Sequence, residues 1–259
     1  VGHWAACLEG ATVRNFYSGI SSAHGMKAAL LAESGVTGVE DAMYRCLLPY
    51  VTDREIGRET LVEQYGTLGD EYYLEDSYFK IHAACRYVHA PVEALERILD
   101  EHDIGAVDVE RIVVRTFDAG TKLSNRHPSN VLGAKFSTPY VLAARLLFGQ
   151  SGVDAFTPEL VDRDDVQALA GRIDIERDER YDERADAGRW GAEVEVRTTD
   201  GDSIVDGVDD ARGGGENPFT EAEIVRKFDD LVVDATSQGT SNRLADSLLA
   251  VGERENVSD

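Results

Sequence analysis

The residues best suited to chemistry gather in one short stretch, residues 77–92, with the sequence SYFKIHAACRYVHAPV. It contains no Asp or Glu, and its side chains of interest are Lys80, His82, Cys85, Arg86 and His89. Lysine and arginine bind carboxylates and phosphates, and histidine transfers protons near neutral pH. We call residues 77–92 the cationic segment and predict that it forms one wall of an anion-binding cleft.

The rest of the chain has the opposite charge. Its 259 residues include 49 Asp and Glu against 26 Lys and Arg, a formal net charge of -23, and five lysines stand beside twenty-one arginines. An acidic, lysine-poor surface stays hydrated at multimolar salt, where screening is strong. We therefore predict a halophilic, salt-in cytoplasm. Nucleic acid is a poor partner, because phosphate binding needs clustered Lys and Arg.

Cysteine usage and hydropathy narrow the classes further. The three cysteines, Cys7, Cys46 and Cys85, are widely spaced and form no zinc pattern, no disulfide framework and no Cys-x-x-Cys pair of the iron–sulfur kind. No run of about 18 apolar residues and no cationic-then-apolar leader occurs, so we expect a cytoplasmic protein.

Two further windows lack acids, residues 10–32 and residues 119–153. The simplest interpretation is that both windows are buried. They nevertheless carry cations, and a buried cation needs either an acid from elsewhere in the fold or an anionic ligand. These residues are Arg14, His24, Lys27, Lys122, Arg126, His127, Lys135 and Arg145.

The elements that must position these residues predict an α+β fold. Helices are expected at 1–12, 25–34, 41–51, 91–101, 138–148, 164–171, 220 onwards and 241–252, and strands at 109–117, 172–177, 193–198 and 203–208. Ser137 or Thr138 can cap the helix that Gly149 ends, and Thr220 with Glu223 forms a capping box. We expect residues 1–50 to belong to a helical domain, residues 51–215 to an α/β domain with a small sheet, and residues 216–259 to return to the helical domain.

Four motifs in this order resemble the MmgE/PrpD family over essentially the whole chain. They are Gly19-x5-Gly25-x2-Ala28-Ala29-x2-Ala32-x2-Gly35, Phe79-Lys80-x4-Cys85-Arg86-Tyr87-x-His89, Ala134-Lys135-Phe136-Ser137-x-Pro139-Tyr140 and Asn217-Pro218-x8-Lys227-Phe228. The resemblance implies a large helical domain and a smaller α/β domain with the active site between them. It also implies a homodimer and no metal or organic cofactor. In this family a long N-terminal stretch precedes the part matched here, and residues 1–10 are expected to be its last helix.

The resemblance also implies site residues. Lys80 and Tyr140 match an active-site lysine and tyrosine, and His89 matches a family histidine. Cys85 stands where some members place an active-site histidine. Two residues depart from the pattern: Arg14 stands where many members have Lys, and Tyr17 where they have His.

The leading functional expectation is therefore a lyase, and specifically a dehydratase of 2-methylcitrate or of a similar hydroxy-tricarboxylate in propionate catabolism. Lys80, Arg86 and Arg14 would bind carboxylates, with Tyr17 and Cys85 lining the substrate site, and Tyr140 or His89 would transfer protons. Alternatives are an epimerase or a decarboxylase of a related polycarboxylate, and a non-catalytic paralogue or half-protein that needs a separate N-terminal chain.

Each site residue also has a plainer interpretation. Lys80 could pair with Glu75 or Asp76 at the surface, and His89 could be a structural hydrogen-bond donor. Tyr140 could belong to the core with its hydroxyl satisfied, and Cys85 could be buried and inert.

Overall fold

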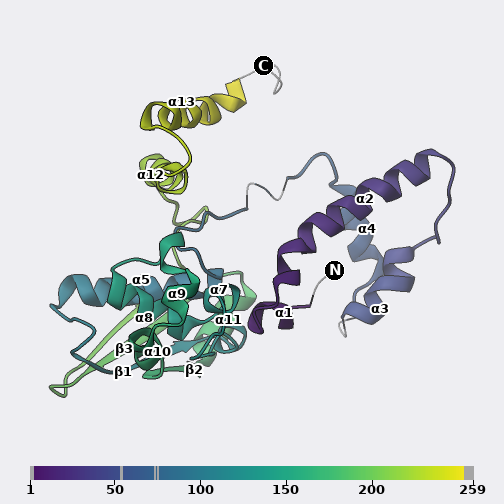
Figure 1. Cartoon of the computed structure of the whole chain (residues 1–259). Helices are drawn as coiled ribbons and strands as arrows, with labels where there is room; N and C mark the ends of the chain where they lie inside the picture. The colour runs from purple at the N-terminus through teal and green to yellow at the C-terminus, as the bar shows by residue number, and fades with distance from the viewer. Residues whose placement is uncertain (1–2, 53–54, 73, 75, 254–259) are drawn as a thin grey trace. The chain divides into compact units, whose positions relative to one another are not determined.

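The computed structural model describes residues 3–52, 55–72, 74 and 76–253. The chain divides into two compact units, which are described separately (Figure 1). The first unit is Thr12–Ser77 together with His3, and the second is Trp4–Ala11 together with the chain from Tyr78 onwards. The predicted return of residues 216–259 to a helical domain stays a prediction.

The first unit is helical. Its elements are η1 (Thr12–Phe16), α2 (Tyr17–Glu33), the π-helical turn η2 (Met43–Leu47), α3 (Leu48–Val51) and α4 (Arg58–Gly66). Helix α2 ends where predicted, because Gly35 adopts a positive φ of 94° and Val36 N–H bonds back to Leu31 O at 3.0 Å. It begins at Tyr17 rather than Gly25.

The second unit contains a four-stranded mixed sheet in the order β2-β1-β3-β4. Its strands are β1 (Val109–Thr116), β2 (Ile173–Arg177), β3 (Ala192–Thr198) and β4 (Ser203–Val208). Strand β1 runs parallel to β2 and antiparallel to β3, and β3 and β4 form the predicted hairpin. Gly201, with φ of 94°, lies in the hairpin turn.

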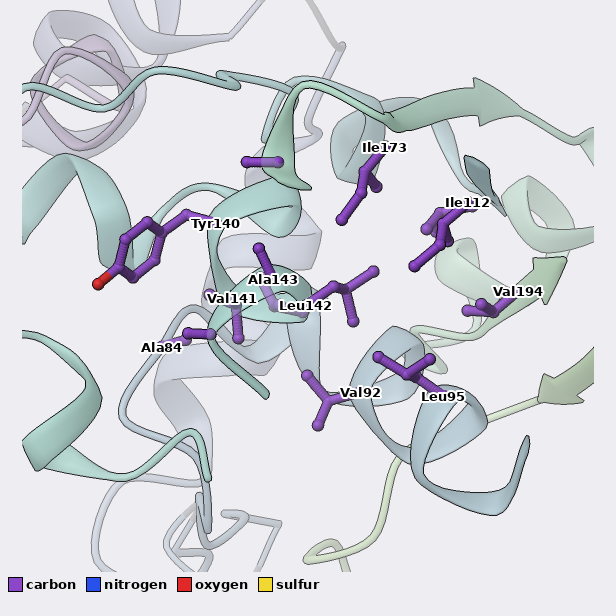
Figure 2. Packing of buried hydrophobic residues seen from close by; sticks show 14 of the residues in the cluster. Ala84, Val92, Leu95, Ile112, Tyr140, Val141, Leu142, Ala143, Ile173 and Val194 are labelled. Atoms are coloured by element: carbon purple, nitrogen blue, oxygen red, sulfur yellow. The ribbon is translucent and has the colours of Figure 1, made fainter. Parts of the chain in front are cut away.

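Two helices cover one face of this sheet, α5 (His89–Glu101) and α8 (Thr138–Phe148). Figure 2 shows Leu95 of α5 and Leu142 of α8 directed toward Ile112 and Val194 of the sheet, with Val92 of α5 in the same cluster. All five side chains are buried. Burying such side chains stabilises the unit by roughly 1.5–3 kcal/mol each.

Further helices complete the second unit. They are α1 (Ala5–Leu8), η3 (Arg86–Val88), α6 (Asp118–Thr121), α7 (Val131–Lys135), η4 (Val153–Ala155), α9 (Pro158–Val161), α10 (Asp164–Ala170), α11 (Glu179–Asp186), α12 (Glu221–Val232), α13 (Gln238–Leu249) and η5 (Ala250–Glu253). Of these, α12 and α13 extend away from the sheet (Figure 1). No helix in the described residues is both long and apolar enough to cross a bilayer.

The predicted α+β fold is confirmed, as are its best-marked ends. Ser137 caps α8 by accepting from Tyr140 N at 3.0 Å, Gly149 ends the helix in the left-handed region, and Thr220 and Glu223 form both bonds of the capping box. Two local expectations were wrong. Among the described residues of 1–12, the expected helix is only the single turn of α1, and the window 10–32 is largely exposed rather than buried. Helix α4 was not predicted.

Candidate functional site

From Tyr78 onwards the cationic segment belongs to the second unit, where hydrogen bonds join it to three separate stretches of chain. Phe79 N–H donates to Gly213 O at 2.9 Å, Ala83 N–H to Ser151 O at 2.9 Å, and Cys85 N–H to Lys135 O at 2.9 Å. The segment then enters η3 and α5. Because its partners come from the glycine-rich loop at 209–216, from the chain just after α8 and from α7, the segment is where these stretches meet.

Arg86 is buried and its guanidinium group already has protein partners. Nη1 donates to Arg212 O at 2.6 Å, Nη2 donates to Ala211 O, and the guanidinium carbon lies 4.7 Å from the ring centroid of Tyr78. Asp210 is 3.7 Å from Nη2. Arg86 therefore joins the cationic segment to the glycine-rich loop, and its predicted carboxylate-binding role stays a prediction.

His82 and His89 form a buried pair, with ring centroids 4.8 Å apart. Nδ1 of His82 is hydrogen-bonded to Ser151 Oγ at 2.7 Å, whereas neither ring nitrogen of His89 has a hydrogen-bond partner among the described residues. Burial, together with the charges of Arg145, Lys227 and Arg86, lowers the pKa of His82 to about 4. The imidazole of His82 is therefore neutral at neutral pH.

The pKa of His89 is lowered further than that of His82, so both imidazoles are neutral at neutral pH. Burial first, and then His82 and nearby cations including Lys80, lower its pKa to about 2. An imidazole with so low a pKa is a weak base in the free protein. An anion bound beside it would favour the imidazolium form and raise that pKa toward neutrality.

Lys80 lies in the exposed part of the segment, next to a lysine from the far end of the sequence. The ammonium group of Lys227, on α12, donates to the backbone carbonyl of Lys80. Among the described residues, neither ammonium group forms an ion pair with Asp or Glu, and Asp76 is thus not a partner of Lys80. Glu75 lies outside the described residues.

Tyr140 lies in the core rather than at a surface. It is fully buried and its hydroxyl donates to Ala155 O at 2.7 Å, at the edge of the cluster in Figure 2. Burial raises its pKa to about 12. This is the arrangement that the core interpretation predicted. Proton transfer by Tyr140 stays a prediction, and it requires this hydrogen bond to break.

The remaining predicted residues lie in different places. Cys85 is half-buried and is not in a disulfide. Arg14 and Tyr17 belong to the first unit, where the Arg14 guanidinium carbon is 6.0 Å from the Tyr17 ring centroid and the Tyr17 hydroxyl donates to His3 O at 3.3 Å. Their roles in substrate binding stay predictions.

Several cations of the acid-free window 119–153 have acids from elsewhere in the fold as partners. Arg145 Nε is 2.7 Å from Glu96 Oε1, Arg126 pairs with Asp174, and Lys122 lies 3.0 Å from Asp118. For Arg145 and Arg126 the interpretation of distant acids is confirmed, whereas the partner of Lys122 is only four positions away. Lys80 and Lys227, at the cationic segment, form no such ion pair among the described residues.

Two cavities open beside the segment. One of about 470 Å³ is lined by Ile81, Lys227 and neighbouring residues of η4 and α12, and one of about 330 Å³ is lined by Ile81, His82 and Glu93 among others. Glu93 Oε1 accepts from Arg212 N at 2.8 Å, and burial raises the pKa of its carboxyl group. Within the described ranges, no group of three or more His, Cys, Asp or Glu side chains is placed to hold a metal ion.

Sequence reasoning did not assign Lys227, Ser151 or Glu93 to the site. Lys227 is in the fourth motif, but its place beside Lys80 depends on a contact across 147 residues, which no local pattern predicts. His82 was visible in the acid-free segment, yet its hydrogen bond to Ser151 spans 69 residues.

Comparison with known proteins agrees with this architecture. Residues 82–250 match the MmgE/PrpD C-terminal domain, and the chain therefore belongs to the MmgE/PrpD family. This confirms the resemblance that the motifs predicted. The matched region contains His82, His89, Tyr140 and Lys227, and it begins two residues after Lys80.

Two relatives are named for their activity. The chain is 26% identical over 272 residues to the cis-aconitate decarboxylase-like protein oryM of Aspergillus oryzae, covering 100% of this chain and 56% of that protein. It is 25% identical over 270 residues to a cis-aconitate decarboxylase of Aspergillus terreus, covering 96% of this chain and 54% of that protein. The chain thus spans about half the length of the curated relatives it matches.

Proposed function

We propose that this chain carries part of the active site of a lyase that acts on a small polycarboxylate. The observation that carries the proposal is the placement of Lys80, which has no carboxylate partner among the described residues, near a buried pair of neutral histidines in a protein of net charge -23. Membership of the MmgE/PrpD family supports the same substrate class. Lysine supplies the charge that holds a carboxylate, and a neutral imidazole is the form that accepts a proton.

The comparisons favour decarboxylation of cis-aconitate over the other reactions. Both relatives described above are named for that activity. In such a step the bond to one carboxylate breaks, carbon dioxide leaves, and the electron pair remaining on carbon takes up a proton. We propose that His82 or His89 donates this proton, because a bound carboxylate would raise the histidine pKa values that burial lowers.

Dehydration of 2-methylcitrate is the second candidate, which the sequence motifs favour. It needs the same carboxylate binding, removal of a proton alpha to a carboxylate, and protonation of the departing hydroxyl group. Its product retains every carbon of the substrate, whereas decarboxylation releases carbon dioxide. Measuring carbon dioxide release and alkene formation in parallel therefore separates the two reactions.

A direct assay tests the proposal. The purified chain would be incubated with cis-aconitate and, separately, with 2-methylcitrate, and Lys80→Ala and Tyr140→Phe would be compared with the parent. We expect Lys80→Ala to lower the rate about a hundredfold or more, as for the loss of one well-placed electrostatic group. Lys122→Ala is the control, because Lys122 pairs with Asp118 instead. Full activity in both Lys80→Ala and Tyr140→Phe would overturn the assignment.

A half-protein that works only with a separate N-terminal chain is the further candidate. The observation in its favour is the exposed apolar surface of α2, where Met26 is 70% and Leu30 is 58% exposed. In this case the 259-residue chain alone is inactive, and adding the complementary part of the family fold restores turnover. Turnover by the chain alone would exclude this candidate. A homodimer also stays a proposal, and light scattering of the purified chain tests it.

A further inference from the structure

The meeting of Lys227 with Lys80 is the least expected feature of the second unit. The chain has five lysines, and two of them lie together here although 147 positions separate them. The Lys227 ammonium group donates to the carbonyl of Lys80, so the two chain segments are in direct contact. Among the described residues, neither lysine has an Asp or Glu ion-pair partner, whereas Lys122 does.

The electrostatics of this pair call for an anion. Burial, and then the charge of Lys80, lower the pKa of Lys227. The like charges of the two lysines repel each other, and an anion that contacts both relieves the repulsion. The charge of Lys227 also lowers the pKa of His82, after burial and the charge of Arg145.

A cavity of suitable size opens at Lys227. Its volume of about 470 Å³ lies in the range of small-molecule sites. Asp154, Asp229 and Asp230 also line the cavity, and Lys80 does not; after burial, the charge that lowers the pKa of Lys227 is that of Lys80. Lys227 is the one cation among the described lining residues, so an anion in this cavity would bind at Lys227.

Helix α12 fixes the direction of Lys227. Glu223, four positions earlier on the same helix face, completes the capping box with Thr220 and receives two hydrogen bonds from the Arg212 guanidinium group at 2.8 and 2.9 Å. Arg212 belongs to the glycine-rich loop that also holds Phe79. The face of α12 that carries Lys227 is thus anchored toward the cationic segment.

We propose that Lys227 is a second carboxylate-binding residue, which acts with Lys80 on one carboxylate group of the substrate. The proposal rests on the proposed function, because it takes a polycarboxylate as the ligand. It adds a binding residue from the C-terminal helices to those that the motifs suggested. A lysine pair contacts a single carboxylate from two directions and so fixes its position as well as its charge.

The test uses propane-1,2,3-tricarboxylate as the probe, because this compound has neither the hydroxyl group nor the double bond of the candidate substrates. Calorimetric titration of the 259-residue chain would compare the parent with Lys227→Met, Lys227→Arg and Lys122→Met. We expect Lys227→Met to weaken binding roughly tenfold or more, as for the loss of a charged hydrogen bond. Lys227→Arg keeps most of the affinity, and Lys122→Met, which removes the same charge elsewhere, leaves it unchanged.

A second measurement needs no variant and therefore does not depend on how a variant folds. Reductive methylation of the parent chain, read by peptide mass spectrometry, reports the accessibility of each lysine. The probe is expected to protect Lys80 and Lys227 and to leave Lys122 unchanged. Protection of Lys80 alone, with unchanged affinity in Lys227→Met, would overturn this inference and leave the proposed function standing. A parent chain that neither binds the probe nor turns over either substrate, even when the complementary part of the family fold is added, would overturn both.

Discussion

At the scale of residues, the cations of the candidate site have contrasting surroundings. Arg86 is buried against two backbone carbonyls and the Tyr78 ring, whereas Lys80 is exposed. The two terminal nitrogens of Arg86 donate to backbone carbonyls, and its buried Nε has no hydrogen-bond partner among the described residues. Lys80 has no carboxylate partner among the described residues and retains its charge for a substrate. The structure thus favours a structural role for Arg86 and a binding role for Lys80.

Replacing Arg86 should therefore reduce stability. Arg86→Met leaves the carbonyls of Ala211 and Arg212 without their donors and removes the link to the glycine-rich loop. We expect the free energy of unfolding, measured by urea denaturation, to fall by about 2–4 kcal/mol. Arg97→Met is the matched control: Arg97 is exposed, lies 3.8 Å from Asp206, and should contribute less than about 1 kcal/mol. Equal losses in the two variants would contradict the structural role.

The low pKa of His82 predicts a dependence of stability on pH. In the unfolded chain His82 takes up a proton near pH 6.5, but in the folded chain only near pH 4. The unfolded state therefore binds more protons between these values, and stability falls as the pH is lowered through this window, by at most about 1.4 kcal/mol per pH unit for this one group. His89 acts in the same direction.

Urea denaturation of the parent and of His82→Gln between pH 7 and pH 4 would measure this effect. The difference in unfolding free energy between the two should narrow as the pH falls, because the variant has no proton to take up at this position. A constant difference across the range would show that His82 titrates normally in the folded chain.

At the scale of elements, the glycine-rich loop determines where the cationic segment lies. Gly213 has a φ of 113°, accepts from Phe79 N–H at 2.9 Å, and donates to Asn217 O at 2.7 Å. A Cβ atom at this position would lie 2.3 Å from Phe79 O and 2.8 Å from the Phe219 ring. Only glycine permits both the backbone conformation and this close approach.

Gly213→Ala should displace the segment next to Lys80. We expect a loss of at least about 2 kcal/mol in the free energy of unfolding, from backbone strain and the contact with Phe79 O. Affinity for propane-1,2,3-tricarboxylate should fall with it. Gly214→Ala is the control in the same loop, since an added Cβ there meets nothing within 4 Å. Comparable effects of the two substitutions would contradict the requirement for glycine at position 213.

Elements with strong local signals could be predicted from sequence. Helix α8 has a serine cap and a terminal glycine, and the hairpin has Asp200-Gly201 in its turn. Helix α4 carries no comparable signal: it has no side-chain cap and no buried face that sequence periodicity could reveal. The early start of α2 has a related cause, because Ser18, Gly19 and Ser21 are poor helix formers and lie within it.

The site could be predicted only in part, for a different physical reason. Lys80, His82 and His89 are close in sequence, so an absence of acids around them was visible. The contacts that define their chemistry come from Ser151 and Lys227, far along the chain. The satisfied hydroxyl of Tyr140 likewise depends on Ala155 O, and no residue pattern around Tyr140 indicates it.

At the scale of the whole molecule, charge is the dominant feature. The chain has 49 Asp and Glu and 26 Lys and Arg, so 23 carboxylates are left without a cation to pair with. Many arginines are already paired; Arg115, for example, lies 3.0 Å from Glu193 and 2.6 Å from Glu195. Salt weakens both these attractions and the repulsion among the excess acids. Each exposed pair contributes only about 0–1 kcal/mol, so repulsion is expected to dominate.

The chain should therefore become more stable as salt concentration rises. At about 1 M salt the screening length is only about 3 Å, which removes most repulsion between separate surface carboxylates. We expect the free energy of unfolding to increase by on the order of a few kcal/mol between 0.1 M and 3 M KCl, measured by thermal and urea denaturation.

The triple variant Glu101→Gln, Glu110→Gln and Asp200→Asn neutralises three exposed acids and changes the formal charge from -23 to -20. It should show a smaller salt response than the parent and a higher stability in 0.1 M KCl. A parent chain whose stability falls or stays constant with KCl would remove the halophilic interpretation, because it would mean that the ion pairs, and not the excess acids, dominate the surface energetics.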